Sequence, residues 1–142
     1  MNPVTIRRLD ELFSTMPVLL GGPVPSSEVD SAEQHVGVKF TSDYREFLER
    51  YGGAMVGSLP MLGLRQAEVM ADDTFSVVDV TARFRADQWE PTNEWVVISM
   101  DLAGNPIGQT SEGEVWVSDH DSGETRRVAR TFEEFVIQLL DE

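Results

Sequence analysis

The sequence predicts an α+β fold in which a mostly antiparallel sheet of short strands packs against helices near the N-terminus, in the middle and at the C-terminus. Two observations predict it. Apolar residues recur at spacings of three and four in segments at both ends and in the middle of the chain. Between residues 95 and 129 the pattern changes to short β-branched runs separated by turns that contain glycine, which is typical of an antiparallel meander.

The first helix is expected to begin at Pro3, because proline suits the first helical position and Asn2 can cap it. Four side chains at helical spacing predict its buried face: Ile6, Leu9, Phe13 and Met16. Prolines and glycines between residues 17 and 25 predict a loop after this helix.

Residues 27–53 predict two consecutive short helices, because caps, apolar spacing and stop signals agree there. Ser27 is expected to cap the first and Gly37 to end it; Thr41 or Ser42 caps the second, and Gly52 ends it. The expected core-facing residues are Val29, Ala32 and Val36 in the first helix, and Tyr44, Phe47, Leu48 and Tyr51 in the second.

The middle of the chain predicts two short strands and another helix. The strands are expected at residues 54–56 and 61–64, and Pro60 between them indicates an edge or a bend. A helical pattern follows Thr74, with its core face formed by Val77, Val80, Thr81 and Phe84.

Residues 95–100 form a nearly continuous apolar run, which predicts a central strand covered on both faces. Turn signals then separate expected strands at residues 107–110, 115–118 and 125–129. Thr131 and Glu134 predict a capping box that starts the last helix. Its expected core face consists of Phe132, Phe135, Val136, Leu139 and Leu140.

Length and composition predict one domain over residues 1–142, since 41% hydrophobic and 25% charged residues are ordinary for a globular chain. The absence of cysteine excludes disulfides, thiolate metal ligands and a cysteine nucleophile. No run of signal-peptide character and no apolar run near the ~20 residues of a membrane helix is present. We therefore expect a cytoplasmic location and no contact with membranes.

The formal net charge is -14, and Lys39 is the only lysine. Such a charge repels nucleic acid and anionic lipid and favours encounter with a basic protein partner. The charge can also serve solubility alone. Composition leaves both interpretations open.

The best chemical motif is Asp119-His120-Asp121, because two carboxylates and an imidazole could bind a divalent metal or transfer protons. A calcium loop that starts at Asp119 fails, since its fifth residue is Gly123 and its twelfth is Arg130. The same residues are good turn formers, and we expect no metal and no cofactor.

The sequence contains no recognisable catalytic motif. His35 is expected on a solvent-exposed flank of its helix, and no Gly-x-Ser-x-Gly elbow, phosphate loop or complete dinucleotide fingerprint is present. The aromatic stripe of residues 44–51 suits core packing better than a ligand cage. We therefore expect a protein that is not an enzyme.

A family pattern runs through the same residues. It reads Val29-x-x-Ala32-Glu33-x-x-Val36-Gly37-Val38-x-Phe40 and then Asp43-Tyr44-x-x-Phe47-Leu48-x-x-Tyr51-Gly52-Gly53. Residues 61–64, 96–101, 104–107, 115–121 and 131–135 continue it in order. In this pattern the chain resembles the SUKH superfamily, whose members include bacterial immunity proteins and yeast Smi/Knr-type regulators of cell-wall synthesis. Thr41 departs from it, because the family often has proline there.

The resemblance implies a single SUKH-like domain that binds a basic toxin domain, commonly a nuclease, and neutralises it by surface occlusion. The residues expected to bind this partner are Glu112, Glu114, Asp119 and Asp121 on the meander loops, with Asp72 and Asp73 as a second cluster. One alternative is a regulatory or scaffolding module that acts in cell-wall synthesis or signalling. Another is a metal or small-ligand site in the loop of residues 119–121.

Overall fold

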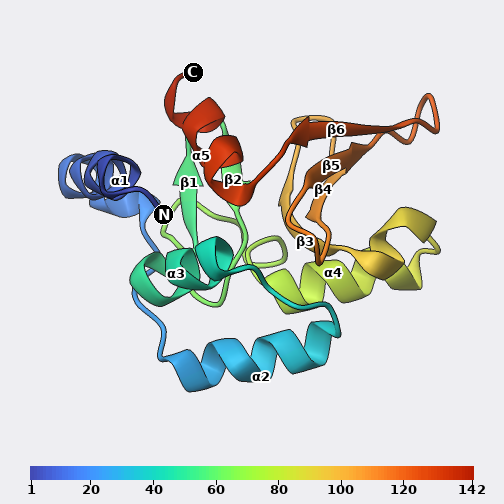
Figure 1. The fold of residues 1–142 in the computed structure, drawn as a ribbon, viewed down its shortest axis with the longest axis horizontal. Helices are drawn as coiled ribbons and strands as arrows, with labels where there is room; N and C mark the ends of the chain where they lie inside the picture. Colours follow the sequence, from blue (N-terminus) through green and yellow to red (C-terminus); the bar gives the residue numbers. More distant parts are fainter.

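The computed structural model describes all residues 1–142 and confirms the α+β prediction (Figure 1). The helices are α1 (Pro3–Thr15), α2 (Ser26–Val36), α3 (Ser42–Tyr51), α4 (Val77–Ala86) and α5 (Phe132–Leu140), with 3-10 helices η1 (Pro17–Leu19) and η2 (Glu90–Glu94). The strands are β1 (Ala54–Val56), β2 (Leu59–Met61), β3 (Val96–Met100), β4 (Pro106–Gln109), β5 (Val115–Ser118) and β6 (Thr125–Ala129).

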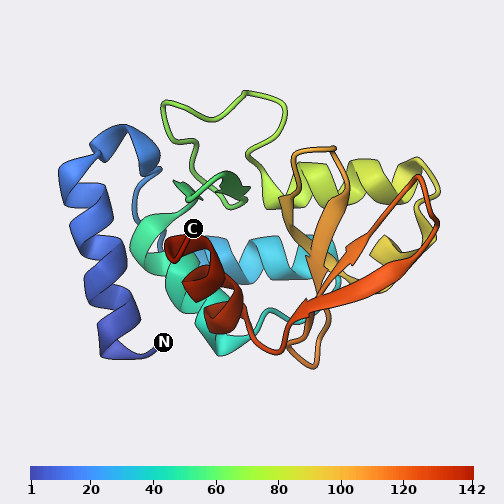
Figure 2. The ribbon, with the colours of Figure 1, turned by 90° about the horizontal axis from the view of Figure 1, so that it is seen from above.

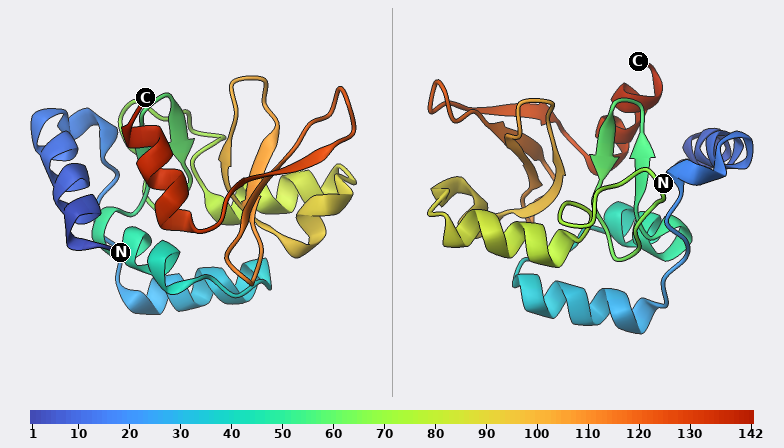
Figure 3. Two further views of the ribbon diagram at one scale, coloured as in Figure 1. Left: turned by 45° about the horizontal axis from the view of Figure 1, so that its top comes forward. Right: turned by 180° about the vertical axis from the view of Figure 1, so that it is seen from behind.

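The strands form two antiparallel sheets, a β1-β2 hairpin and a β3-β4-β5-β6 meander, as the turn signals predicted. Because successive hairpins of a meander turn at alternate ends, the β3–β4 and β5–β6 turns share one end and the β4–β5 turn lies at the other (Figure 3). Helix α1 and the meander lie at opposite ends of the molecule, with the remaining elements between them (Figures 1 and 2).

Two strand predictions were wrong. The second strand is Leu59–Met61 rather than residues 61–64, and Pro60 lies within it opposite Met55. A two-stranded sheet has only edge strands, where proline is tolerated. The run of residues 95–100 contains β3, which is an edge strand of the meander and not a central one. It is buried because the segment that follows β2 covers its free edge, where Leu62 N donates to Ile98 O at 2.8 Å.

The core forms one cluster that contains residues from all five α-helices and both sheets. At its centre, the ring of Phe132 lies 5.2 Å from that of Tyr44 and 5.4 Å from that of Phe47, in edge-to-face geometry. The Tyr44 hydroxyl donates to Leu62 O at 2.7 Å, so the buried phenol is satisfied. The predicted core faces of α2, α3 and α4 are confirmed.

Most predicted caps are confirmed: Asn2 caps α1, Thr41 caps α3 and Thr131 caps α5. The Ser27 cap was wrong, because Glu28 N and Val29 N bond to Pro25 O and α2 therefore begins at Ser26. Only one of the two hydrogen bonds expected of the capping box at Thr131 and Glu134 forms.

Two details at helix ends differ from the prediction. Glu134 N donates to Thr131 Oγ1, but the Glu134 carboxylate accepts from Arg130 N, outside the capping residue. Met16 does not extend the core face of α1, because the helix ends at Thr15 and leaves Met16 exposed.

Candidate protein-binding surface

The segment between α4 and β3 borders several hollows that are lined by acidic residues. Helix α4 ends at Ala86, the chain reverses at Gln88 in a left-handed conformation (φ 62°), and η2 begins at Glu90 with Pro91 as its second residue. This is the one residue other than glycine with positive φ in the chain, and it directs η2 back across the meander.

Arg85 fixes η2 to its neighbours without any carboxylate partner. Its guanidinium donates to Thr92 O at 2.9 Å, in the middle of η2, and to Trp95 O at 2.8 Å, directly after η2. A third bond of 2.6 Å reaches Val36 O at the C-terminus of α2. Burial lowers the pKa of Arg85, but a guanidinium stays protonated at any physiological pH. The segment is therefore held by three charge-assisted hydrogen bonds.

Trp89, the residue directly before η2, connects η2 to the meander. Its indole N–H donates to Ser118 Oγ at 2.9 Å on β5. Its ring lies edge-to-face with Phe84 at 5.2 Å and with His120 at 6.0 Å. These contacts place the β5–β6 turn beside η2.

Three shallow hollows meet along η2, since Pro91 lines all of them. Glu94 shares the first with Glu112 and Glu114; Glu90 shares another with Asp119. We call the acidic residues that border these hollows the η2 surface: Asp87, Glu90, Glu94, Glu112, Glu114 and Asp119.

The η2 surface carries little compensating positive charge. Glu114 pairs with Arg127 at 2.8 Å, and none of the other five acids makes an ion pair. Lys39 also lines the first hollow and makes no ion pair. The surface is therefore a local concentration of negative potential within a chain of net charge -14.

The structure brings together only some of the residues that the sequence analysis proposed. Glu112 and Glu114 lie at the β4–β5 turn, Asp119 lies at the opposite end of β5, and η2 connects the two ends. Asp121 lies in the β5–β6 turn with an 84% exposed side chain 3.2 Å from His120 Nε2, and it does not line these hollows.

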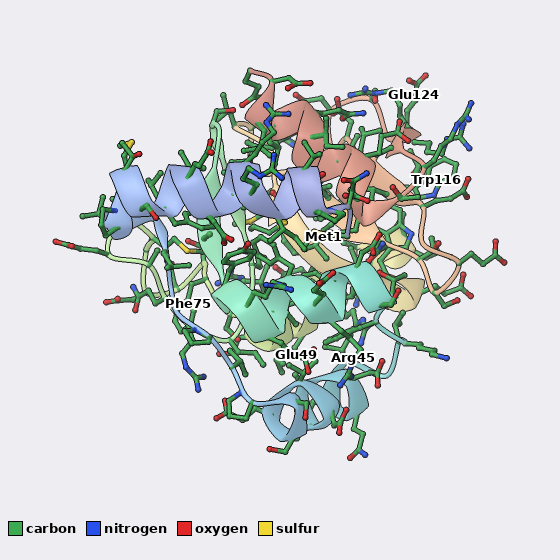
Figure 4. The ribbon with its side chains drawn as sticks, turned by 60° about the vertical axis from the view of Figure 1, so that its left-hand side comes forward. Met1, Arg45, Glu49, Phe75, Trp116 and Glu124 are labelled. Atoms are coloured by element: carbon green, nitrogen blue, oxygen red, sulfur yellow. The ribbon has the colours of Figure 1, made fainter.

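Asp72 and Asp73 form a separate cluster in the loop between β2 and α4. The Asp72 carboxylate accepts from Gln66 at 2.6 Å, and Asp73 O accepts from Arg83 at 2.9 Å. In Figure 4, Phe75 of this loop lies on the side of the molecule away from Trp116. Neither Asp72 nor Asp73 lines the three hollows, so this cluster is separate from the η2 surface.

The sequence analysis missed three residues of the η2 surface, namely Asp87, Glu90 and Glu94. Their signal was three acids within eight residues around Pro91. Their approach to the meander depends on Trp89 and Arg85, which no local pattern predicts.

The Asp119-His120-Asp121 motif stabilises the β5–β6 turn through hydrogen bonds. Asp119 Oδ1 accepts from Asp121 N at 2.8 Å and from Ser122 N at 3.3 Å. His120 N donates to Asn105 Oδ1 at 3.1 Å, and Asn105 Nδ2 donates to Asp101 Oδ2 at 2.9 Å, which joins this turn to the β3–β4 turn. No three histidine, aspartate or glutamate side chains lie in an arrangement that could hold a metal ion.

His35 lies on the exposed flank of α2, as predicted, with its ring nitrogen Nδ1 2.8 Å from Ser31 O. The two histidines thus sit on different elements, one in a helix and one in a turn.

Comparison with known protein families decides the identity of the fold. The model of the SMI1 / KNR4 family (SUKH-1) matches residues 23–138. The chain belongs to this family. The SUKH resemblance in the sequence is therefore confirmed, and the family region contains the whole η2 surface while α1 and η1 precede it. No curated protein matched the chain. No helix of this SUKH-1 protein has the length and apolar character needed to cross a membrane.

Proposed function

We propose that this SUKH-1 protein is a non-enzymatic immunity protein that binds a basic toxin domain, commonly a nuclease, and neutralises it by occluding its surface. Family membership supports this, because the SUKH superfamily includes bacterial immunity proteins. The same membership also supports a regulatory role of the SMI1/KNR4 type, which is the second candidate.

The observation that carries the proposal is the η2 surface. Five of its six carboxylates make no ion pair, and they border adjoining hollows rather than isolated protrusions. A nuclease surface is positively charged because it holds phosphates, so an acidic concave surface can compete for it. The second candidate has no matching feature, since a regulatory partner need not be basic.

The proposal is tested by capture and by protection. The tagged protein is used to capture partners from the source organism, which are identified by mass spectrometry. The gene of a captured basic toxin domain is then expressed in cells with and without this protein. We expect capture of one such domain and survival only when both proteins are present.

A matched pair of variants connects the result to the surface. Glu90→Lys/Glu94→Lys reverses two unpaired acids of η2, and Glu11→Lys/Glu68→Lys makes the same charge change at exposed positions of α1 and of the loop after β2. Protection should be lost only in the first. Capture of a non-toxic regulatory partner would overturn the immunity proposal and favour the second candidate.

A further inference from the structure

The first hollow of the η2 surface differs from the rest because it contains a tryptophan. Trp116 of β5 lies half-buried in its wall, on the sheet face opposite to the core-facing Val115 and Val117. Trp116 is paired with Gly108 on the neighbouring strand β4. The ring of Trp95 covers Gly108 so closely that a Cβ atom there would lie 2.5 Å from it. The Trp116 ring therefore has an apolar neighbour on the β4 side, while the residue paired with it on β6 is Arg127, which Glu114 holds in an ion pair.

Carboxylates line the same hollow as this ring. Glu94 comes from η2 and Glu112 from the β4–β5 turn; both are exposed and neither makes an ion pair. Glu114 also lines the hollow, but Arg127 holds it at 2.8 Å. An aromatic face with two free carboxylates on different elements is a suitable environment for a planar cation.

A separate observation is an unsatisfied hydroxyl on a residue that lines the same hollow. Thr110 Oγ1 is the only buried side-chain polar atom of the protein without a hydrogen-bond partner, and Thr110 lines this hollow. Buried hydroxyls are normally satisfied, because an unpaired one costs free energy. A guanidinium presents five N–H donors in a plane, which suits a hollow lined by carboxylates from two elements.

We infer that this hollow binds an arginine side chain of the protein partner, stacked on Trp116 and hydrogen-bonded to Glu94 and Glu112. Arginine fits better than lysine. The lysine ammonium is a compact point charge that does not stack on an aromatic ring or form bidentate hydrogen bonds with a carboxylate. A membrane or nucleic acid does not fit, since both present phosphate to these carboxylates. The inference rests on the proposed function only for the identity of the partner.

Lys39 provides an internal test because it lines the same hollow. It competes with an incoming cation for the carboxylates, so Lys39→Gln should strengthen binding of an arginine. If the hollow instead received an acidic group, Lys39→Gln would weaken binding.

The experiment uses three capped peptides that differ at one residue type: Gly-Arg-Gly-Arg-Gly and its lysine and citrulline counterparts. The protein is labelled with ¹⁵N, and the indole N–H signals of its three tryptophans are followed during titration. The arginine peptide should shift the Trp116 signal, the lysine peptide should bind several-fold more weakly, and the citrulline peptide should cause no shift. Trp116→Leu should lower the affinity for the arginine peptide by roughly fivefold to thirtyfold.

Glu112→Gln at the exposed turn keeps the test valid if Trp116→Leu does not fold, and Glu11→Gln on α1 is the control. Equal shifts for all three peptides, or shifts that map away from Trp116, would overturn the inference. Capture of a basic toxin domain that binds Trp116→Leu as tightly as the parent would refute this inference alone. A positive arginine titration without any toxic partner would refute only the immunity function.

Discussion

The guanidinium of Arg85 lies 2.6 Å from the carbonyl oxygen of Val36, where α2 ends at Gly37. The last carbonyls of a helix lack partners within the helix, and a cation there also complements the helix dipole. The same guanidinium donates to Thr92 O within η2 and to Trp95 O directly after it, so one side chain joins the first family helix to the candidate binding surface.

Replacing Arg85 should therefore destabilise the protein. Arg85→Met keeps the apolar stem but removes the guanidinium that donates to three carbonyl groups, and we expect a loss of about 2 to 3 kcal/mol in the free energy of unfolding. Arg83→Met is the control, because exposed Arg83 makes a single bond to Asp73 O. Urea unfolding of both variants measures the difference, and equal midpoints would contradict the role given to Arg85.

Phe47 should be among the most sensitive core positions. Its side chain is fully buried and contacts the rings of Tyr51 and Phe132 at 5.2 and 5.4 Å. Phe47→Ala should cost about 3 to 5 kcal/mol, since the cavity cannot close between rigid rings. Half-buried Glu49, on the other side of α3, should tolerate alanine with little change. Urea midpoints that coincide for these two variants would show that the helix phase is wrong.

The faces of the helices could be predicted because burial in a helix follows a local period. Phe47 faces the core for the same reason that its neighbours Tyr44 and Tyr51 do, and no distant residue changes that. Strand position could not be predicted in this way. The run that contains β3 reads as a central strand, but its second cover is the segment around Leu62, which is over thirty residues away in sequence.

The candidate surface was predicted only in part for a related reason. Glu112 and Asp119 are close in sequence, yet an antiparallel strand separates them by its whole length. Glu90 is distant in sequence from Asp119, yet they line one hollow because Trp89 bonds to Ser118. Charge patterns along the chain report acidity but not which acids meet, since tertiary contacts decide that.

The two tyrosines should resist ionisation in the folded protein. Burial raises the pKa of Tyr44 well above its ordinary value of 10.0. Burial and the hydrogen bond to Asp10 also raise that of Tyr51. A raised folded-state pKa gives stability that is complete below pH 10 and is lost as the pH rises above it, where only the unfolded state releases the proton.

An alkaline titration tests this directly, because the chain contains only two tyrosines. Tyrosinate absorbance should stay low through pH 10 and then rise in one step together with loss of the helical circular dichroism. The urea-unfolded protein is the control and should titrate near its ordinary pKa. A reversible rise of half the signal near pH 10, with the helices intact, would show that one phenol is free to ionise.

Association with the basic partner should slow steeply as salt rises. The acids of the η2 surface are exposed or half-buried and five are unpaired, so they act by long-range attraction. Such charges are largely screened beyond about 8 Å at 0.15 M salt. Stopped-flow binding of the captured partner across a salt series measures the association rate of the parent and of Glu112→Lys and Asp119→Lys.

Both reversals should lower the association rate, because the side chain of Glu112 is exposed and that of Asp119 is half-buried, so both charges act on the diffusional encounter. Asp72→Lys makes the same charge change in the separate cluster after β2 and separates the two surfaces that the sequence proposed. If Asp72→Lys slows association and the other two do not, the partner binds the Asp72 side of the molecule. If the parent's rate does not change with salt and all three reversals are neutral, the acidic surface serves solubility, and neutralisation must use another face.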